Sequence, residues 1–105
     1  MSLTITTRPT VHSTTIRIAG EVDLACAHKL RSVLRGLTGD AVLDCSELSF
    51  IDSTGLSVLL GAHRRFEAEG HRLRLIGVTQ AAHRTLRVAG LDRVLLVEAA
   101  ERTEC

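Results

Sequence analysis

Apolar and polar residues alternate along two short stretches near the start of the chain, residues 3–8 and 14–20. Both stretches are rich in Ile and Thr, β-branched residues that favour extended backbone. Pro9 interrupts the first stretch, and only a few residues separate it from the second. The pattern therefore predicts two antiparallel strands that form a hairpin.

Farther along the chain, the spacing of apolar residues changes to that of amphipathic helices. Residues 24–37 carry an apolar stripe at helical spacing, and Gly36 and Gly39 mark its end. The elements predicted after the hairpin are helices at residues 24–37, 54–69 and 80–88 and strands at residues 41–45, 71–78 and 94–98.

Alternating strands and helices favour parallel strands joined by helical connections. We expect an α/β fold with a mixed sheet of four or five strands, an antiparallel hairpin first and parallel strands after it. The chain of 105 residues fits a single domain, residues 1–105, with a core at about residues 3–98. Loops that leave parallel strands for helices meet at one edge of the sheet. We therefore expect the following loops to lie side by side: residues 20–23, 46–53 and 77–79.

Composition adds few constraints on function. Hydrophobic residues make up 45% of the chain and charged residues 24%, as in ordinary globular domains. A formal net charge of +1 gives no general attraction to nucleic acid or anionic membranes. The three cysteines form no C-x-x-C motif, which fits a reducing compartment, and no leader or membrane-spanning stretch is recognisable. We expect a cytoplasmic monomer that binds neither nucleic acid nor membrane.

The stretch IDSTGL, residues 51–56, is the first candidate for chemistry, because it opens a predicted helix with polar residues. Asp52 or Ser53 could simply cap the helix by accepting hydrogen bonds from free backbone N–H groups. The same helix start carries partial positive charge and tolerates a phosphate on Ser53. Gly55 would leave the backbone open to approach, and Asp52 would add charge or orient the hydroxyl. Ser53 can act as a cap, a phosphoacceptor or both.

Longer stretches around this one resemble a known family. LDCSELSFIDSTGLSVLLGAHRR (residues 43–65) is similar to the central signature of the STAS family, and specifically to that of stand-alone bacterial anti-sigma factor antagonists. IAGEVDLACAHKL (residues 18–30) resembles the family's acidic motif after its second strand. GVTQAAHRTLRVAGLDRVLLV (residues 77–97) resembles its last strand, helix and strand. The three stretches occur in the family's order and spacing.

The resemblance implies a regulator of transcription in a stress response or in development such as sporulation. Its partner would be a serine-kinase anti-sigma factor that holds ATP, releases a sigma factor when bound, and phosphorylates Ser53. The phosphorylated protein would bind poorly until a serine phosphatase restores it. Asp23 matches the family's acidic position beside this serine. The partner-binding residues expected from these motifs are Glu21, Asp23, Asp52, Ser53, Thr54 and Gly55.

Two other functions fit the same residues. A STAS module can act as a scaffold or sensor that binds its partners regardless of phosphorylation. Alternatively, the helix start could bind a small anionic or nucleotide ligand. A serine hydrolase is not supported, because IDSTGL lacks the G-x-S-x-G motif. The five histidines show no ligand spacing, so we predict no catalytic residue, metal site or cofactor.

The remaining polar and sulfur-containing residues are interpreted first as structural. His63 lies on the apolar stripe of its predicted helix and is expected to pack there. Cys26 and Cys45 are expected to be buried, and Cys105 to be exposed. The arginines at positions 64, 65, 72 and 74 are expected to be solvated, with contact to an acidic partner as the alternative.

Overall fold

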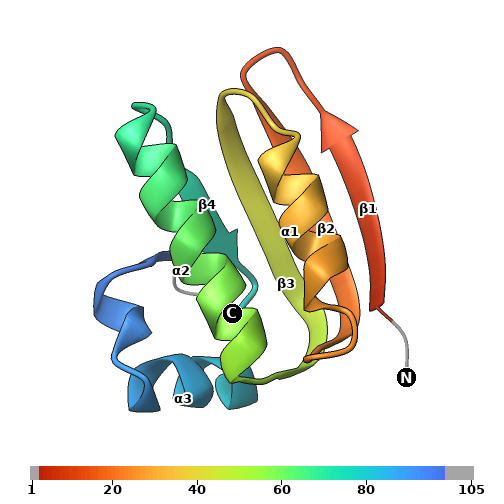
Figure 1. Ribbon diagram of the computed structural model, residues 1–105, viewed down its shortest axis with the longest axis vertical. Helices are drawn as coiled ribbons and strands as arrows, with labels where there is room; N and C mark the ends of the chain where they lie inside the picture. The colour runs from red at the N-terminus through yellow and green to blue at the C-terminus, as the bar shows by residue number, and fades with distance from the viewer. Residues whose placement is uncertain (1–2, 99–105) are drawn as a thin grey trace, which may run out of the picture.

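The computed structural model describes residues 3–98 as a five-stranded sheet with helices packed against it (Figure 1). The strands are β1 (Leu3–Pro9), β2 (Ser13–Val22), β3 (Asp40–Ile51), β4 (Leu73–Ile76) and β5 (Leu96–Val97). The helices are α1 (Ala27–Arg35), α2 (Ser53–Ala68), α3 (Gln80–Val88) and the 3₁₀ helix η1 (Leu91–Arg93). Strands follow chain order across the sheet; β1 is antiparallel to β2, and the other neighbouring pairs are parallel. The predicted α/β fold with an N-terminal hairpin is confirmed.

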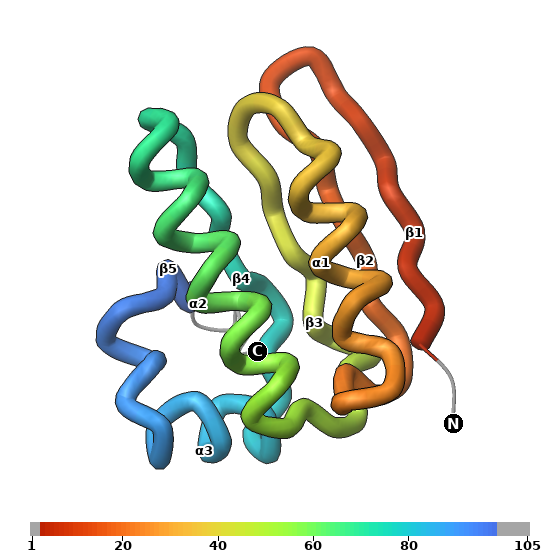
Figure 2. The backbone as a smooth tube through the Cα atoms, viewed as in Figure 1, coloured from red at the N-terminus to blue at the C-terminus, as the bar shows by residue number. Residues whose placement is uncertain are grey.

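The helices α1 and α2 lie side by side on one face of the sheet (Figures 1 and 2). Cys26, Cys45 and His63 are buried, as predicted; Cys105 lies outside the described residues. The largest fully buried side chains are Ile16, Ile18, Val22, Leu30, Leu34, Leu43, Cys45, Leu59, Leu73 and Leu75. This aliphatic core fixes the two helices against the sheet.

The strands β2 and β3 continue farther than their hydrophobic patterns predict. The predicted strands ended at residues 20 and 45, whereas the β2–β3 ladder runs on to Val22 and Ile51. Two register shifts interrupt this ladder, so the apolar alternation breaks while the pairing continues. The two predicted strand-to-helix loops therefore shrink, and Asp23 and Asp52 directly follow their strands.

Other boundaries also differ from the prediction. The first helix begins at Ala27 and not at residue 24, because residues 24–26 form a turn ahead of it. The predicted buried strand at residues 94–98 is wrong in extent: β5 has only two residues, and Leu96 is 42% exposed. The 3₁₀ helix before it has no counterpart in the prediction. None of these differences moves the start of α2.

The start of α2 packs very closely against the sheet at Gly55. A Cβ atom at this position would lie 2.6 Å from Cγ1 of Ile51 and 2.9 Å from both Cγ1 and the carbonyl oxygen of Val22. The glycine is buried. We expected Gly55 to leave the backbone at the helix start open to approach. That expectation is wrong, because Val22 and Ile51 of the sheet occupy the space where a side chain of residue 55 would lie.

Replacing Gly55 with alanine is expected to lower the free energy of unfolding by about 1–3 kcal/mol, because the added methyl group overpacks this contact. Gly61, in the exposed middle of the same helix, is the matched control. A Cβ there meets nothing within 4 Å. Gly61→Ala should raise stability by about 0.5–1 kcal/mol. Urea unfolding measures both, and equal effects at the two positions would contradict the packing described.

Candidate functional site

Asp52 is the N-cap of α2 and also holds the turn that precedes α1. Its Oδ1 atom accepts a hydrogen bond from the backbone N–H of Gly55 at 3.0 Å. Its Oδ2 atom accepts one from the backbone N–H of Leu24 at 3.1 Å. The N–H of Asp52 itself donates to the carbonyl oxygen of Val22 at 3.2 Å. A single carboxylate thus joins two segments that are far apart in the sequence.

Asp23 organises the turn between β2 and α1. Its Oδ1 atom accepts hydrogen bonds from the backbone N–H groups of Ala25 at 3.1 Å and Cys26 at 3.3 Å. The Cys26 thiol donates to the same atom at 3.1 Å. The hydrogen bond from the Cys26 side chain, assisted by those backbone N–H groups, lowers the pKa of Asp23 below its ordinary value. The carboxylate is therefore firmly anionic at neutral pH.

Ser53 is the first residue of α2, and it is exposed. Because Asp52 supplies the cap, the Ser53 hydroxyl is free of that task and forms no hydrogen bond within the described residues 3–98. The backbone N–H groups of Ser53 and Thr54 likewise find no acceptor in that range, as expected at a helix start. The result is an accessible hydroxyl beside free N–H donors.

The structure brings together the two motifs that contain the predicted site residues. The hydrogen bond from Leu24 to Asp52 joins the turn at Asp23 to the start of α2, so the expected proximity of these loops is confirmed. Glu21 and Thr54 are half-buried beside them, whereas Gly55 lies beneath the surface. The third predicted loop, residues 77–79, also lies against the segment 46–53, because a Cβ at Gly77 would be 3.0 Å from Cβ of Ser46. The first turns of α3, and not the loop itself, form a shallow pocket with the end of β3.

Two exposed apolar side chains at this end of the sheet escaped the sequence analysis. Leu24 is 79% exposed in the turn after Asp23, and Phe50 is 50% exposed near the end of β3. Each is an apolar residue next to a polar one at a strand or helix boundary. An apolar residue at such a boundary can be suspected of being exposed. The sequence analysis instead assigned Leu24 to a helix and Phe50 to a loop. Single exposed apolar side chains are common on protein surfaces, so these two are of interest only because they flank the segments that carry Asp23 and Asp52.

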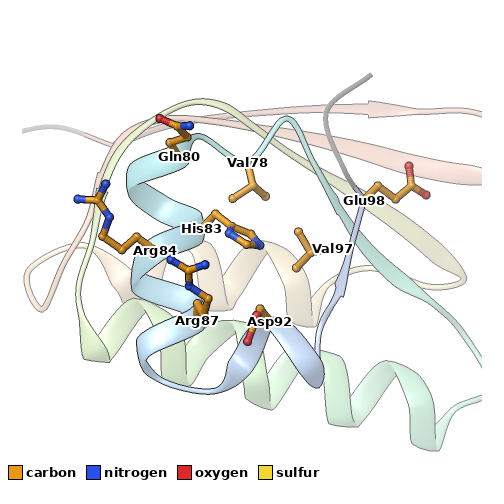
Figure 3. Close-up of a pocket in the computed structure, with 8 residues that line it drawn as sticks. All are labelled: Val78, Gln80, His83, Arg84, Arg87, Asp92, Val97 and Glu98. Atoms are coloured by element: carbon orange, nitrogen blue, oxygen red, sulfur yellow. The ribbon is translucent and has the colours of Figure 1, made fainter. Parts of the chain in front are cut away.

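A larger cavity lies elsewhere, between α3 and the end of the sheet (Figure 3). It measures about 450 Å³, and its polar lining consists of Gln80, His83, Arg84, Arg87, Asp92 and Glu98. None of the predicted site residues lines it. The small-ligand alternative, which placed a ligand at the start of α2, therefore gains no support from this cavity.

Metal and thiol chemistry find no support in the described part of the chain. No group of three or more His, Cys, Asp or Glu side chains within residues 3–98 is arranged to hold a metal ion. Burial raises the pKa of the Cys45 thiol to about 12, so this thiol is neutral and unreactive. Across the same residues, no helix has the length and apolar character needed to cross a membrane.

Comparison with known proteins identifies the family. The family model described as "Mlab, STAS domain" matches residues 5–98, and the chain belongs to the STAS domain family. An anti-sigma-B factor antagonist of Listeria monocytogenes is 31% identical over 105 aligned residues, which cover 96% of this chain and 91% of the relative. The predicted resemblance to the STAS family and its anti-sigma factor antagonists is confirmed.

Solved structures agree with the fold. An anti-sigma factor antagonist from Mycobacterium paratuberculosis superposes with a TM-score of 0.82 at 21% identity, covering 91% of this chain and 85% of that one. The Bacillus cell fate determinant SpoIIAA in its phosphorylated form superposes with a TM-score of 0.69 at 22% identity, covering 93% and 92%. The strands and helices described above therefore form the STAS fold.

Asp52→Ala should destabilise the protein by about 1–2 kcal/mol, because it removes the cap of α2. It also removes the link to Leu24, so hydrogen exchange at the Leu24 and Gly55 amides should accelerate together. Ser53→Ala is the matched control and should change stability by less than about 0.5 kcal/mol, since that side chain is exposed. An unchanged exchange rate at Leu24 in Asp52→Ala would refute the link.

The lowered pKa of Asp23 predicts a specific dependence of stability on acid. Its contribution is complete above the unfolded-state pKa of about 4 and is lost as the pH falls through the lower folded-state pKa. Asp23→Asn keeps the acceptor oxygen but removes the charge. The stability difference between wild type and Asp23→Asn should therefore shrink below about pH 4.

Urea unfolding between neutral and strongly acidic pH measures this difference. The pKa of Asp44 is also lowered: burial opposes the shift, but hydrogen bonds from Ser46 outweigh it. Asp44 is present in both proteins, so its contribution cancels in the comparison. A difference that stays constant from neutral to acidic pH would show that the charge of Asp23 contributes nothing to stability.

Proposed function

We propose that this protein is an anti-sigma factor antagonist that binds a serine-kinase anti-sigma factor and releases it when Ser53 is phosphorylated. The observation that carries the proposal is the exposed Ser53 hydroxyl, which forms no hydrogen bond within residues 3–98 and stands at the start of a helix capped by its neighbour. The relatives support the role, because the Listeria protein is named an anti-sigma-B factor antagonist. SpoIIAA of Bacillus, which has a similar fold, has a structure in a phosphorylated form.

In the proposed reaction, Oγ of Ser53 attacks the γ-phosphorus of ATP held by the kinase. The new O–P bond forms as the bond to the ADP oxygen breaks, and the hydroxyl proton passes to a base. Both oxygens of Asp52 already accept backbone hydrogen bonds, so this carboxylate is a poor candidate for the base. We assign the base to the kinase, so the chain acts as the substrate and contributes no catalytic group.

The fold is expected to survive this modification. A phosphoserine carries a charge of about −1.5 to −2 at neutral pH. At the first residue of a helix, this charge is stabilised by the helix dipole and by free N–H groups. The N–H groups of Ser53 and Thr54 have no acceptor in the described part of the chain and are available to it. Phosphorylation therefore changes the surface and leaves the scaffold intact.

The partner is expected to lose affinity for electrostatic reasons. The unmodified surface combines exposed apolar side chains at Leu24 and Phe50 with carboxylates at Asp23 and Asp52. A phosphate dianion added here must be desolvated against the partner and lies close to existing negative charge. A penalty of about 3 kcal/mol would weaken binding more than about a hundredfold.

The rest of the proposed cycle follows from this switch. A serine phosphatase removes the phosphate, and the antagonist then binds the anti-sigma factor again. The anti-sigma factor in turn releases the sigma factor. The exchange takes place in the cytoplasm, where sigma factors meet RNA polymerase, and the antagonist acts as a monomer.

Wild-type, Ser53→Ala and Ser53→Asp proteins, used as bait in a lysate of the source cells, test the proposal. The first two should recover a small ATP-binding protein, and Ser53→Asp should not, because it carries negative charge at the switch. Binding of the purified partner to Ser53→Asp should be about a hundredfold weaker than to wild type by calorimetry. With ATP, the partner should phosphorylate the wild-type protein at Ser53 and leave Ser53→Ala unmodified.

Ser57 provides the control, because it is exposed one turn farther along the same helix. Its hydroxyl donates to the carbonyl oxygen of Ser53 at 3.0 Å. Ser57→Ala should still be phosphorylated at Ser53, because the Ser57 hydroxyl is not the proposed acceptor. If Ser53→Asp binds as tightly as wild type, the protein is a scaffold that ignores phosphorylation and the proposal fails.

A further inference from the structure

The helices α1 and α2 lie side by side on one face of the molecule (Figures 1 and 2). Side chains of both helices line a groove between them. Its volume is about 150 Å³, and it is lined by Arg31, Leu34, Arg35, Ser57, Val58, Gly61, Ala62 and Arg65. Arg65 closes part of it by donating a hydrogen bond to the carbonyl oxygen of Leu34. The functional site described above does not include these residues.

The groove is strongly basic although the chain is nearly neutral. The helix α1 carries Lys29, Arg31 and Arg35 and no acidic residue, whereas the whole chain has a formal charge of +1. Arg31 and Arg35 are exposed and form no ion pair with any residue in the range 3–98. Their positive charge is therefore available to an external anionic group.

The side of α2 that borders the groove carries small residues. Ser53, Ser57 and Gly61 are exposed and recur every four residues, so they share one side of the helix. Gly61 has no positive φ, and a Cβ there would meet nothing within 4 Å. The fold of the chain itself thus gives no reason for a glycine, which destabilises a helix interior. Because Gly61 has no side chain, a segment of a binding partner can approach the backbone of α2 at this position.

Two other charged surfaces differ from this groove because acidic residues accompany their arginines. The cavity in Figure 3 combines Arg84 and Arg87 with Asp92 and Glu98, so charges of both signs line it. On the sheet, Arg17 of β2 pairs with Glu47 of β3 at 3.1 Å. The groove between α1 and α2 has no acidic residue in its lining, and of its three arginines only Arg65 forms an ion pair within the described residues, with Glu69 at 3.5 Å.

We propose that this groove binds an acidic segment of the anti-sigma factor, so that the start of α2 and the groove form one continuous docking face. The inference rests on the proposed function for the identity of the partner. Charge complementarity argues for the acidic segment, and the row from Ser53 through Ser57 to Gly61 connects the two regions. Arg31 and Arg35 contact carboxylates, and Gly61 lets the segment approach the helix backbone.

A peptide titration tests the charge preference without the partner. Isotope-labelled protein is titrated with a short peptide of Glu and Ala, and the control peptide contains Gln in place of Glu. Amide shifts caused only by the acidic peptide are expected at Arg31, Arg35, Ser57 and Gly61, and they should diminish from roughly 50 mM to roughly 500 mM salt. Absence of shifts, or equal shifts at Arg84 and Arg87, would overturn the proposal.

Variants test the same surface against the partner recovered with the Ser53→Ala bait. In that background, Arg31→Glu with Arg35→Glu should weaken binding by about tenfold or more, and association should slow most at low salt, because both arginines are exposed. Arg84→Glu with Arg87→Glu is the matched control, because both residues are exposed on α3, and it should bind normally. Gly61→Leu should also weaken binding, while its unfolding transition shows that the fold is retained.

The outcomes separate this inference from the proposed function. If Ser53→Asp abolishes binding while Arg31→Glu with Arg35→Glu binds normally, control by phosphorylation is supported and binding in the groove is refuted. If the arginine variant loses binding while Ser53→Asp keeps it, binding in the groove is supported and control by phosphorylation is refuted. Equal losses in the arginine variant and the α3 control would indicate a general charge effect and would overturn the groove.

Discussion

The carboxylate of Asp52 holds together the part of the structure on which the proposed function depends. One oxygen caps α2 through the N–H of Gly55, and the other accepts the N–H of Leu24 from the turn that precedes α1. Both helices therefore begin from one junction at the carboxyl ends of β2 and β3. Gly55 makes this junction possible, because any side chain there would collide with Val22 and Ile51. The geometry of the site is set by atoms that lie beneath its surface.

In this arrangement, neighbouring residues have different roles. Asp52 and Gly55 maintain the scaffold, and Asp23 organises the adjoining turn through Ala25 and Cys26. Ser53 takes part in none of these hydrogen bonds and is exposed. A group that contributes little to stability can be modified without unfolding the protein, and the start of a helix is a favourable place for added negative charge. A phosphorylation switch can therefore act on the surface while the sheet and helices remain in place.

The sequence allowed much of this to be predicted, because the relevant signals are local. Alternating and helical spacing located the strands and helices, and IDSTGL placed Ser53 at a helix start. The ends of β2 and β3 could not be located this way, since register shifts break the apolar alternation while pairing continues. The role of Gly55 was misassigned for a related reason. A glycine in a motif does not reveal whether a ligand or the protein's own sheet approaches it.

Long-range contacts also explain what the sequence left undecided at the site. Asp52 and Ser53 were equivalent candidates for the cap, and only the hydrogen bonds to Gly55 and Leu24 distinguish them. The most direct test of the account compares amide spectra, unfolding midpoint and partner affinity of the unmodified protein with those of protein carrying phosphate on Ser53. The account predicts spectral changes confined to the starts of α1 and α2, an unfolding midpoint that does not fall, and loss of the partner. Changes spread through the core, or undiminished binding, would contradict it.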